Sequence, residues 1–156
     1  MNFLTKSITL SAAAVSLALA SPAAAQMEVY ENYEPSDAVI ELTFVKVDEG
    51  QFETYLEGLK STWVAANEIQ KELGYISSYG IYGVPYGENH FNMVLRVSFP
   101  STEMIGPSKE RYMAFLEAYG QANIDQGDQT VRELYNKIRK IQATYLLRPI
   151  NLIDDE

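Results

Sequence analysis

The chain has 156 residues, of which 21 are acidic and 12 are basic, and its formal net charge is −9. A charge this negative repels phosphate groups, so we expect no nucleic-acid binding and no attraction to anionic membrane surfaces. Because the chain has no cysteine, disulfides, thiol catalysis and thiolate metal sites are excluded.

Residues 1–25 have the pattern of a cleavable secretory signal peptide. Lys6 is the only charged residue among them, an apolar run follows, and Ala23-Ala24-Ala25 offers small residues at the cleavage positions. The apolar run is shorter than the roughly 20 residues that span a bilayer. We therefore expect an exported protein, periplasmic or secreted, that begins at Gln26 and has no membrane segment after cleavage.

The first half of the remaining chain predicts a leader, a strand and a long helix. Residues 26–37 are acidic and interrupted by proline, which is typical of a flexible leader. Residues 38–47 alternate with period two, which indicates a strand. We expect its larger residues to face the helices and Val39, Val45 and Val47 to face away. Apolar residues then recur every three or four positions over 52–73, which predicts a helix with Trp63 in the core and Gly74 as its C-cap.

The second half predicts two more strands, two helices and a last strand. Residues 75–84 and 91–99 read as strands on either side of a turn at 85–89. A helix is expected over 108–119, followed by a polar loop over 121–129. Thr130 has the spacing of a capping box for the next helix. A strand over 143–150 and an acidic tail over 151–156 end the chain.

The resulting order is β-α-β-β-α-β over residues 38–150. It predicts an α+β domain of the ferredoxin-like type, with a four-stranded antiparallel sheet and the helices on one face. The other face of the sheet is left open. The apolar side chains expected on that face, Val39, Val45, Val47 and Val94, favour a partner.

Several local features add a resemblance to this pattern. They are the strand end Val45-Lys46-Val47, Gly50 before a long helix that contains Trp63, Gly74 before a tyrosine-rich strand, and the strand over 92–99. In these the chain resembles the dimeric α+β barrel superfamily, and within it NIPSNAP-like, EthD-like and antibiotic-biosynthesis-monooxygenase-like domains. The resemblance implies a homodimer in which two open sheet faces enclose a cavity. Members differ in function, from cofactor-free oxygenases to haem-degrading enzymes, so the resemblance does not choose one.

The candidate ligand-binding residues are polar side chains expected on or near the open face. Glu41 and Arg96 are expected to meet as a cross-strand pair, either as the floor of a ligand cavity or as an ion pair that sets strand register. Tyrosines of the second strand offer phenols to a ligand, although tyrosine is also common on half-buried strands. The full candidate set is Glu41, Thr43, Tyr79, Tyr82, Asn92, Arg96 and Ser98.

The sequence offers no recognisable catalytic motif. His90 is the only histidine; it would serve either as a general base or metal ligand, or as an ordinary exposed residue of a hairpin. We expect no metal site and assign no cofactor and no catalytic residue. The favoured function is binding of a small organic ligand. The alternative is a cofactor-independent oxygenase or isomerase for an aromatic or enolisable substrate, which would require Glu41, Asn92, Arg96 and the tyrosines to converge on one cavity.

Overall fold

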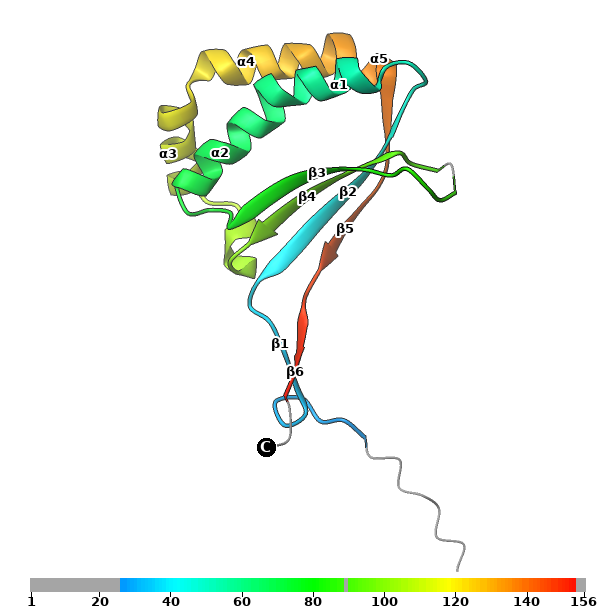
Figure 1. The fold of residues 1–156 in the computed structure, drawn as a ribbon. Helices are drawn as coiled ribbons and strands as arrows, with labels where there is room; N and C mark the ends of the chain where they lie inside the picture. Colours follow the sequence, from blue (N-terminus) through cyan, green and yellow to red (C-terminus); the bar gives the residue numbers. More distant parts are fainter. Residues whose placement is uncertain (1–25, 89, 154–156) are drawn as a thin grey trace, which may run out of the picture.

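The computed structural model describes residues 26–88 and 90–153; the expected signal peptide lies outside the described residues. Its main sheet is antiparallel, in the order β3-β4-β2-β5. These strands are Ser78–Gly83, Met93–Phe99, Val39–Val47 and Arg139–Leu147, in that order. Helices connect β2 to β3 and β4 to β5, and they cover one face of the sheet (Figure 1). This strand order and connectivity confirm the ferredoxin-like α+β fold.

The first connection is one long helical rod, as the apolar spacing predicts. It runs through α1 (Phe52–Leu59), a π-helical segment η1 (Lys60–Val64) and α2 (Ala65–Glu72). Gly74 follows with a φ of +73°, the left-handed conformation expected after a helix C-terminus.

The second connection contains more helix than the sequence predicts. After a 3₁₀ turn η2 (Thr102–Ile105) comes α3 (Lys109–Tyr119), which is capped by the Ser108 side chain. A second rod follows: α4 (Gln121–Thr130), the π-helical segment η3 (Val131–Tyr135) and α5 (Asn136–Ile138).

The expected loop over 121–129 and the capping box at Thr130 are therefore wrong. Side-chain hydrogen bonds one turn apart join Gln121 to Asp125 and Gln129 to Glu133, and they support this polar helix. Thr130 lies inside the rod, where its hydroxyl donates to the carbonyl of Gln126. The last strand also begins four residues earlier than expected, at Arg139.

The two faces of β2 are reversed relative to the prediction. Val39, Val45 and Val47 are at most 1 % exposed, in the core beneath the helices. The register pairs Val45 with Met93 and Val39 with Phe99, so these residues share the helix-covered face. The larger set is on the open face instead, namely Ile40, Leu42 and Phe44. Both faces of this strand are apolar, so its own alternation does not tell which face the helices cover.

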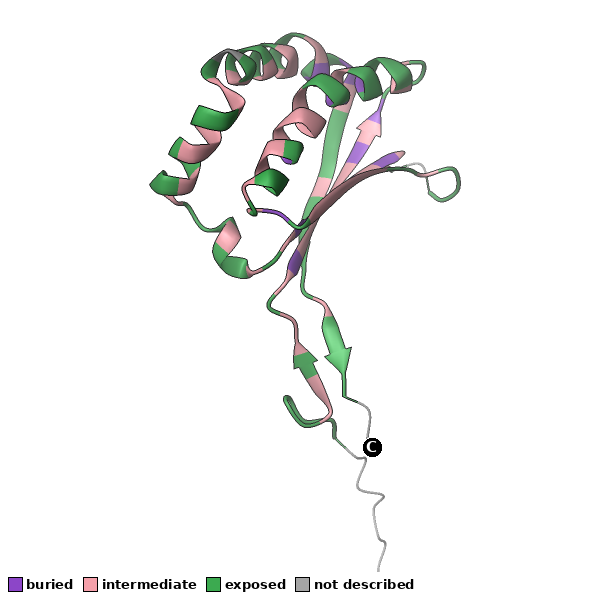
Figure 2. Cartoon of the chain, turned by 60° about the vertical axis from the view of Figure 1, so that its left-hand side comes forward, coloured by how far each residue is buried: buried purple, intermediate pink, exposed green. Residues whose placement is uncertain are grey.

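The core lies between the sheet and the two rods. Its buried members come from β2, β4, α1, η3 and α5, and Figure 2 marks buried stretches of the chain in purple on strands and on helices. They are Val45, Val47, Tyr55, Leu59, Met93, Leu95, Tyr135 and Ile138. Two of them are tyrosines, whose rings contribute to packing while their hydroxyls need partners.

The leader and the C-terminal segment pair with each other. Strand β1 (Tyr33–Pro35) forms a short antiparallel ribbon with β6 (Ile150–Leu152), and the ribbon projects away from the main sheet (Figure 1). The expectation of a flexible leader thus does not hold for residues 33–35. Ile150 and Leu152 on this ribbon are more than 60 % exposed. None of the helices in the described part of the chain is long and apolar enough to cross a membrane.

Candidate functional site

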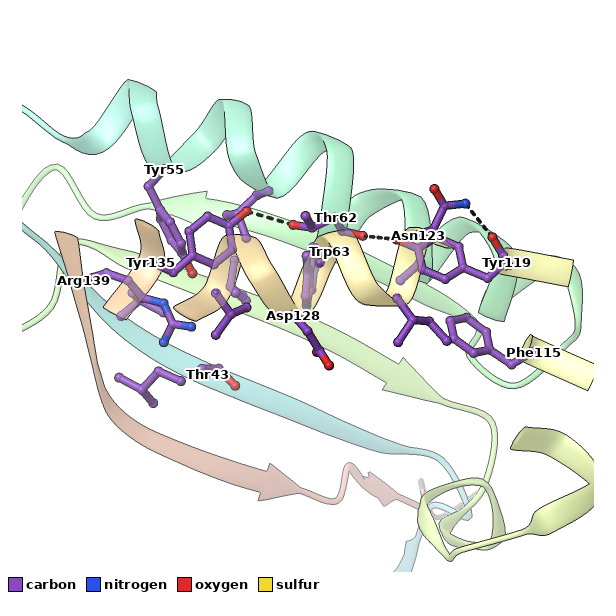
Figure 3. Close-up of a pocket in the computed structure, with 18 residues that line it drawn as sticks. Thr43, Tyr55, Thr62, Trp63, Phe115, Tyr119, Asn123, Asp128, Tyr135 and Arg139 are labelled. Carbon is purple, nitrogen blue, oxygen red and sulfur yellow. Dashed lines mark hydrogen bonds between the residues drawn. The ribbon is translucent and has the colours of Figure 1, made fainter. Parts of the chain in front are cut away.

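The structure contains a pocket of about 400 Å³ between the helices and the sheet. Its walls come from both helical rods and from α3, and its floor comes from β2, β4 and β5. Figure 3 shows the lining side chains pointing into this space from both sides. The volume of the pocket is in the range of ordinary small-molecule sites, roughly 300–1,000 Å³. The pocket is on the helix-covered face, whereas the sequence analysis expected a cavity on the open face.

One end of the pocket is formed by Arg139 and two buried tyrosines. Arg139 is the first residue of β5, and its guanidinium carbon lies 5.7 Å from the ring centroids of both Tyr55 and Tyr135. The two rings meet edge to face at 4.9 Å. Both tyrosines are at most 3 % exposed. The cation is thus held by ring faces, a contact that keeps its charge and leaves its buried Nε–H without an acceptor.

Tyr135 is fixed by a hydrogen bond to the opposite rod. Its hydroxyl lies 2.8 Å from the Thr62 hydroxyl, which itself donates to the carbonyl of Gly58 at 2.9 Å. Because the Thr62 hydrogen is used in that way, the phenol is the donor. A Cβ at Gly58 would stand 2.7 Å from the Tyr135 ring, so glycine is what allows this close approach.

The two π-helical segments both line the pocket. Thr62 and Trp63 belong to η1, and Val131 and Tyr135 belong to η3. The hydrogen bond between Thr62 and Tyr135 therefore joins one π-helical segment to the other. Such segments are rare in proteins and often occur where a helix contributes to a functional site.

The other end of the pocket is largely aromatic and apolar. Phe115 and Tyr119 of α3 stack at 5.1 Å, and Ile124 of α4 lies beside them in the lining. Trp63 lies between the two ends in Figure 3, with its ring edge to face with Tyr79 at 5.4 Å. Trp63 is half-buried and lines the pocket, so it is more than the core residue predicted.

The tyrosine hydroxyls of the pocket are neutral donors at physiological pH. Burial raises the pKa of Tyr55, although the positive charge of Arg139 acts in the opposite direction. Burial likewise raises the pKa of Tyr135, and the positive charge of Arg139 opposes this shift. Burial also raises the pKa of Tyr119. None of the three is thereby prepared to act as a base.

The structure separates the sequence-predicted candidates onto two faces of the sheet. Arg96 lies opposite Leu42 and Gly80, on the open face, as expected. Glu41 lies opposite Val97, on the helix-covered face. The expected pair between Glu41 and Arg96 is therefore wrong, because side chains of adjacent positions point to opposite faces. Thr43 is the one candidate that lines the pocket.

The other candidates have local roles or lie apart. The Asn92 side chain accepts a hydrogen bond from the backbone N–H of Val47 at 2.8 Å and donates to its carbonyl at 2.9 Å, so it ties two strands together. Ser98 and Tyr82 share the open face with Arg96, and the Ser98 hydroxyl is buried without a partner. Tyr79 faces the helices and donates to the Glu68 carboxylate. These side chains do not converge on one cavity.

His90 lies on the hairpin between β3 and β4, away from the pocket. It is exposed, and its Nε2 lies 3.0 Å from a carboxylate oxygen of Glu88. Within residues 26–88 and 90–153, no three histidine or acidic side chains are grouped in a way that would hold a metal ion.

Apart from Thr43, the sequence pattern does not single out the residues that line the pocket. Arg139 was expected in a helix, ahead of the last strand, and its position beside two tyrosines depends on where that strand begins. The available signal was tyrosine at apolar helix positions, as at Tyr119 and Tyr135. A hydroxyl on an otherwise apolar stripe needs a partner, which indicates a polar feature within the packed layer.

Comparisons with known proteins find structural neighbours but no family. No family model matches the sequence, and no curated protein matches it significantly. A protein from Shewanella oneidensis is similar in structure, with 11% identity, a TM-score of 0.48, and coverage of 77% of this chain and 99% of that one. A dimeric protein from Bacteroides fragilis, described as having a ferredoxin-like fold, has 11% identity and a TM-score of 0.40, over 76% of this chain and 99% of that one.

A third neighbour is a protein from Bacteroides thetaiotaomicron that is described as a possible oxidoreductase. It has 11% identity and a TM-score of 0.39, over 74% of this chain and 98% of that one. The resemblance to NIPSNAP-like, EthD-like and antibiotic-biosynthesis-monooxygenase-like domains is not confirmed by a family match. The ferredoxin-like assignment stands on the strand order of this chain itself.

Proposed function

We propose that this protein binds a small organic molecule in the pocket between its helices and its sheet. The observation that carries the proposal is the pocket itself: about 400 Å³, mostly apolar and aromatic, with a few polar groups gathered at one end. This combination is characteristic of sites that enclose an apolar ligand and orient it by a few hydrogen bonds. No catalytic role is proposed for its residues. The alternative, an oxygenase or isomerase, depended on a convergence of candidates that the fold does not produce.

A pocket-filling variant tests the proposal. Native mass spectrometry of protein purified from its own host would first detect any retained molecule. We expect Ala66→Leu, which adds volume to the pocket lining, to abolish retention, while the matched change Ala118→Leu on the exposed side of α3 preserves it. Equal retention by both variants, in protein that melts normally, would place the ligand elsewhere.

We also propose that the protein forms a homodimer through its open sheet face. Large apolar side chains are spread over that face, and several are more than 40 % exposed. They are Ile40, Leu42, Phe44, Tyr82, Val94, Tyr145 and Leu147. An apolar sheet face of this kind favours a second sheet over water. Because the pocket is on the opposite face, each subunit would keep its own pocket.

Arg96 needs a partner in such a dimer. The register places no acidic side chain on the open face of the described strands. The rings of Phe44, Tyr82 and Tyr145 on that face can contact a guanidinium. The side chain of Arg96 therefore fits an interface role better than the ligand role considered from the sequence.

Export is proposed from the sequence of residues 1–25. The supporting features are the single positive charge, the apolar run and the alanines that end at Ala25. N-terminal sequencing of protein recovered outside the cytoplasm should begin at Gln26. Recovery of chains that still begin at Met1 would refute cleavage at this site.

A further inference from the structure

We infer that the ligand of the pocket is an organic anion, an apolar carboxylate whose charged group is bound by Arg139. The inference rests on the proposed binding function and adds the chemical class of the ligand. It is carried by the uncompensated charge of Arg139, by the geometry of its N–H groups, and by the arrangement of polar and apolar lining around it.

The charge of Arg139 has no anionic partner within the described residues. Its Nε atom is buried and has no hydrogen-bond partner. No carboxylate of the described residues forms an ion pair with its guanidinium. Arg139 is partly buried, and a guanidinium in such a position is costly unless its charge and its N–H groups are satisfied. The rings of Tyr55 and Tyr135 offset part of the charge but accept none of these hydrogen bonds.

The position of Arg139 suits a ligand with one charged end. Its side chain lies at one end of the pocket beside Thr43, whereas Phe115 lies at the other end (Figure 3). The Nε and Nη groups of a guanidinium bind a carboxylate through two parallel hydrogen bonds. A carboxylate at Arg139 would therefore place an attached apolar body along Trp63 toward Phe115.

Asp128 is the acidic residue among the described lining, and it opposes anion binding. It comes from α4 and lies between the two ends in Figure 3, without an ion pair to Arg139. Its negative charge disfavours an anion nearby, and its removal should therefore strengthen anion binding. The inference therefore predicts opposite effects on anion affinity: loss of Asp128 increases it, and loss of Arg139 decreases it.

The test compares two probes of the same size, one with a carboxylate and one with a neutral amide. Phenylbutyrate and phenylbutyramide have the same ring and chain, and Trp63, the only tryptophan of the protein, reports occupancy by its fluorescence. We expect the purified protein to bind phenylbutyrate at least about tenfold more tightly than the amide. Arg139→Met should remove this preference and leave the affinity for the amide unchanged. Asp128→Asn should increase the preference for phenylbutyrate.

Two further variants keep the test decisive. Arg148→Met removes an exposed arginine outside the pocket and should change neither affinity. If Arg139→Met does not fold, Arg139→Lys keeps the charge but loses the paired N–H geometry, and it should retain part of the preference. Equal affinity for both probes, or a preference that persists in Arg139→Met, would overturn the anion inference and leave the binding proposal intact. If neither probe changes Trp63 fluorescence, both proposals fail.

Discussion

Tyr79 lies on the helix-covered face of the sheet, with its hydroxyl donating to the Glu68 carboxylate on α2. This hydrogen bond, together with burial and the negative charge of Glu68, raises the pKa of Tyr79 from 10.0 to about 12. The ionised phenolate would lose the hydrogen bond and face the carboxylate at short range. The folded protein therefore holds this proton more strongly than the unfolded chain does.

This pKa predicts a loss of stability in alkali. The contribution of Tyr79 is complete below the unfolded pKa near 10 and is lost as the pH rises through about 12. Thermal melts between these pH values should fall less steeply for Tyr79→Phe than for the parent protein. Glu68→Gln should lower the pKa of Tyr79 in an ultraviolet titration. If comparison of the two titrations shows that Tyr79 has an ordinary tyrosine pKa in the parent protein, the hydrogen bond to Glu68 does not form in solution.

Trp63 belongs both to the packing of the long helix and to the pocket. Since one side of its ring lines the pocket, its replacement removes fewer packed contacts than a fully buried tryptophan would lose. We expect Trp63→Ala to cost stability near or below the lower end of the roughly 3–5 kcal/mol typical of a core tryptophan. Chemical denaturation followed by circular dichroism measures this, and an unchanged midpoint would contradict the packing described here.

At the scale of elements, the contact between the two rods depends on one glycine. Gly58 in α1 leaves room for the Tyr135 ring of η3, and Thr62, one turn further along, forms a hydrogen bond with the Tyr135 hydroxyl. A helix gains stability when glycine is replaced by alanine in its interior, by up to about 1 kcal/mol. At Gly58 that gain competes with a clash against a ring that is only 3 % exposed.

Two glycine substitutions of the same kind should therefore have opposite effects. We expect Gly58→Ala to destabilise the protein by about 1–2 kcal/mol, since forcing an extra group into a packed region costs about 1–3 kcal/mol. Gly127→Ala, within α4, should stabilise it, because a Cβ there meets nothing within 4 Å. Both effects are measured by denaturant unfolding. A stabilising Gly58→Ala would show that Tyr135 moves freely, and the hydrogen bond to Thr62 would then be dispensable.

At the scale of the whole molecule, the two faces of the sheet differ in what covers them. The helices close one face and leave the pocket beneath them, and the open face remains apolar. The charge of the protein keeps separate molecules apart in solution, so a specific contact must come from surface complementarity. The open sheet face offers exposed apolar side chains for that contact.

A charge placed on the open face should prevent dimer formation. Leu42 lies between Arg96 and Tyr145 on neighbouring strands, so Leu42→Lys adds a second cation at the middle of the face. We expect light scattering to show a dimer for the parent protein and a monomer for Leu42→Lys. Leu56→Lys, on the exposed side of α1, is the matched control and should remain dimeric. A parent protein that is monomeric at micromolar concentration would refute the homodimer.

The sequence by itself determined the elements whose signals are local. Period-two alternation located the strands, three-and-four spacing located the long helix, and Gly74 and Gly120 marked helix ends, both with positive φ. From the order of these elements the ferredoxin-like topology followed. The polar helix α4 was missed, because its residues have weak helical preference and its support comes from side chains one turn apart.

Only the tertiary structure decided which faces and which distant residues meet. Strand β2 has apolar side chains on both faces, so which face is buried depends on its register with β4. The sequence of β2 alone does not determine that register. The same is true of the pocket, in which Tyr55, Tyr135 and Arg139 come from three elements. Periodicity is fixed by backbone geometry within a segment, whereas a pocket is fixed by how segments far apart in the chain pack together.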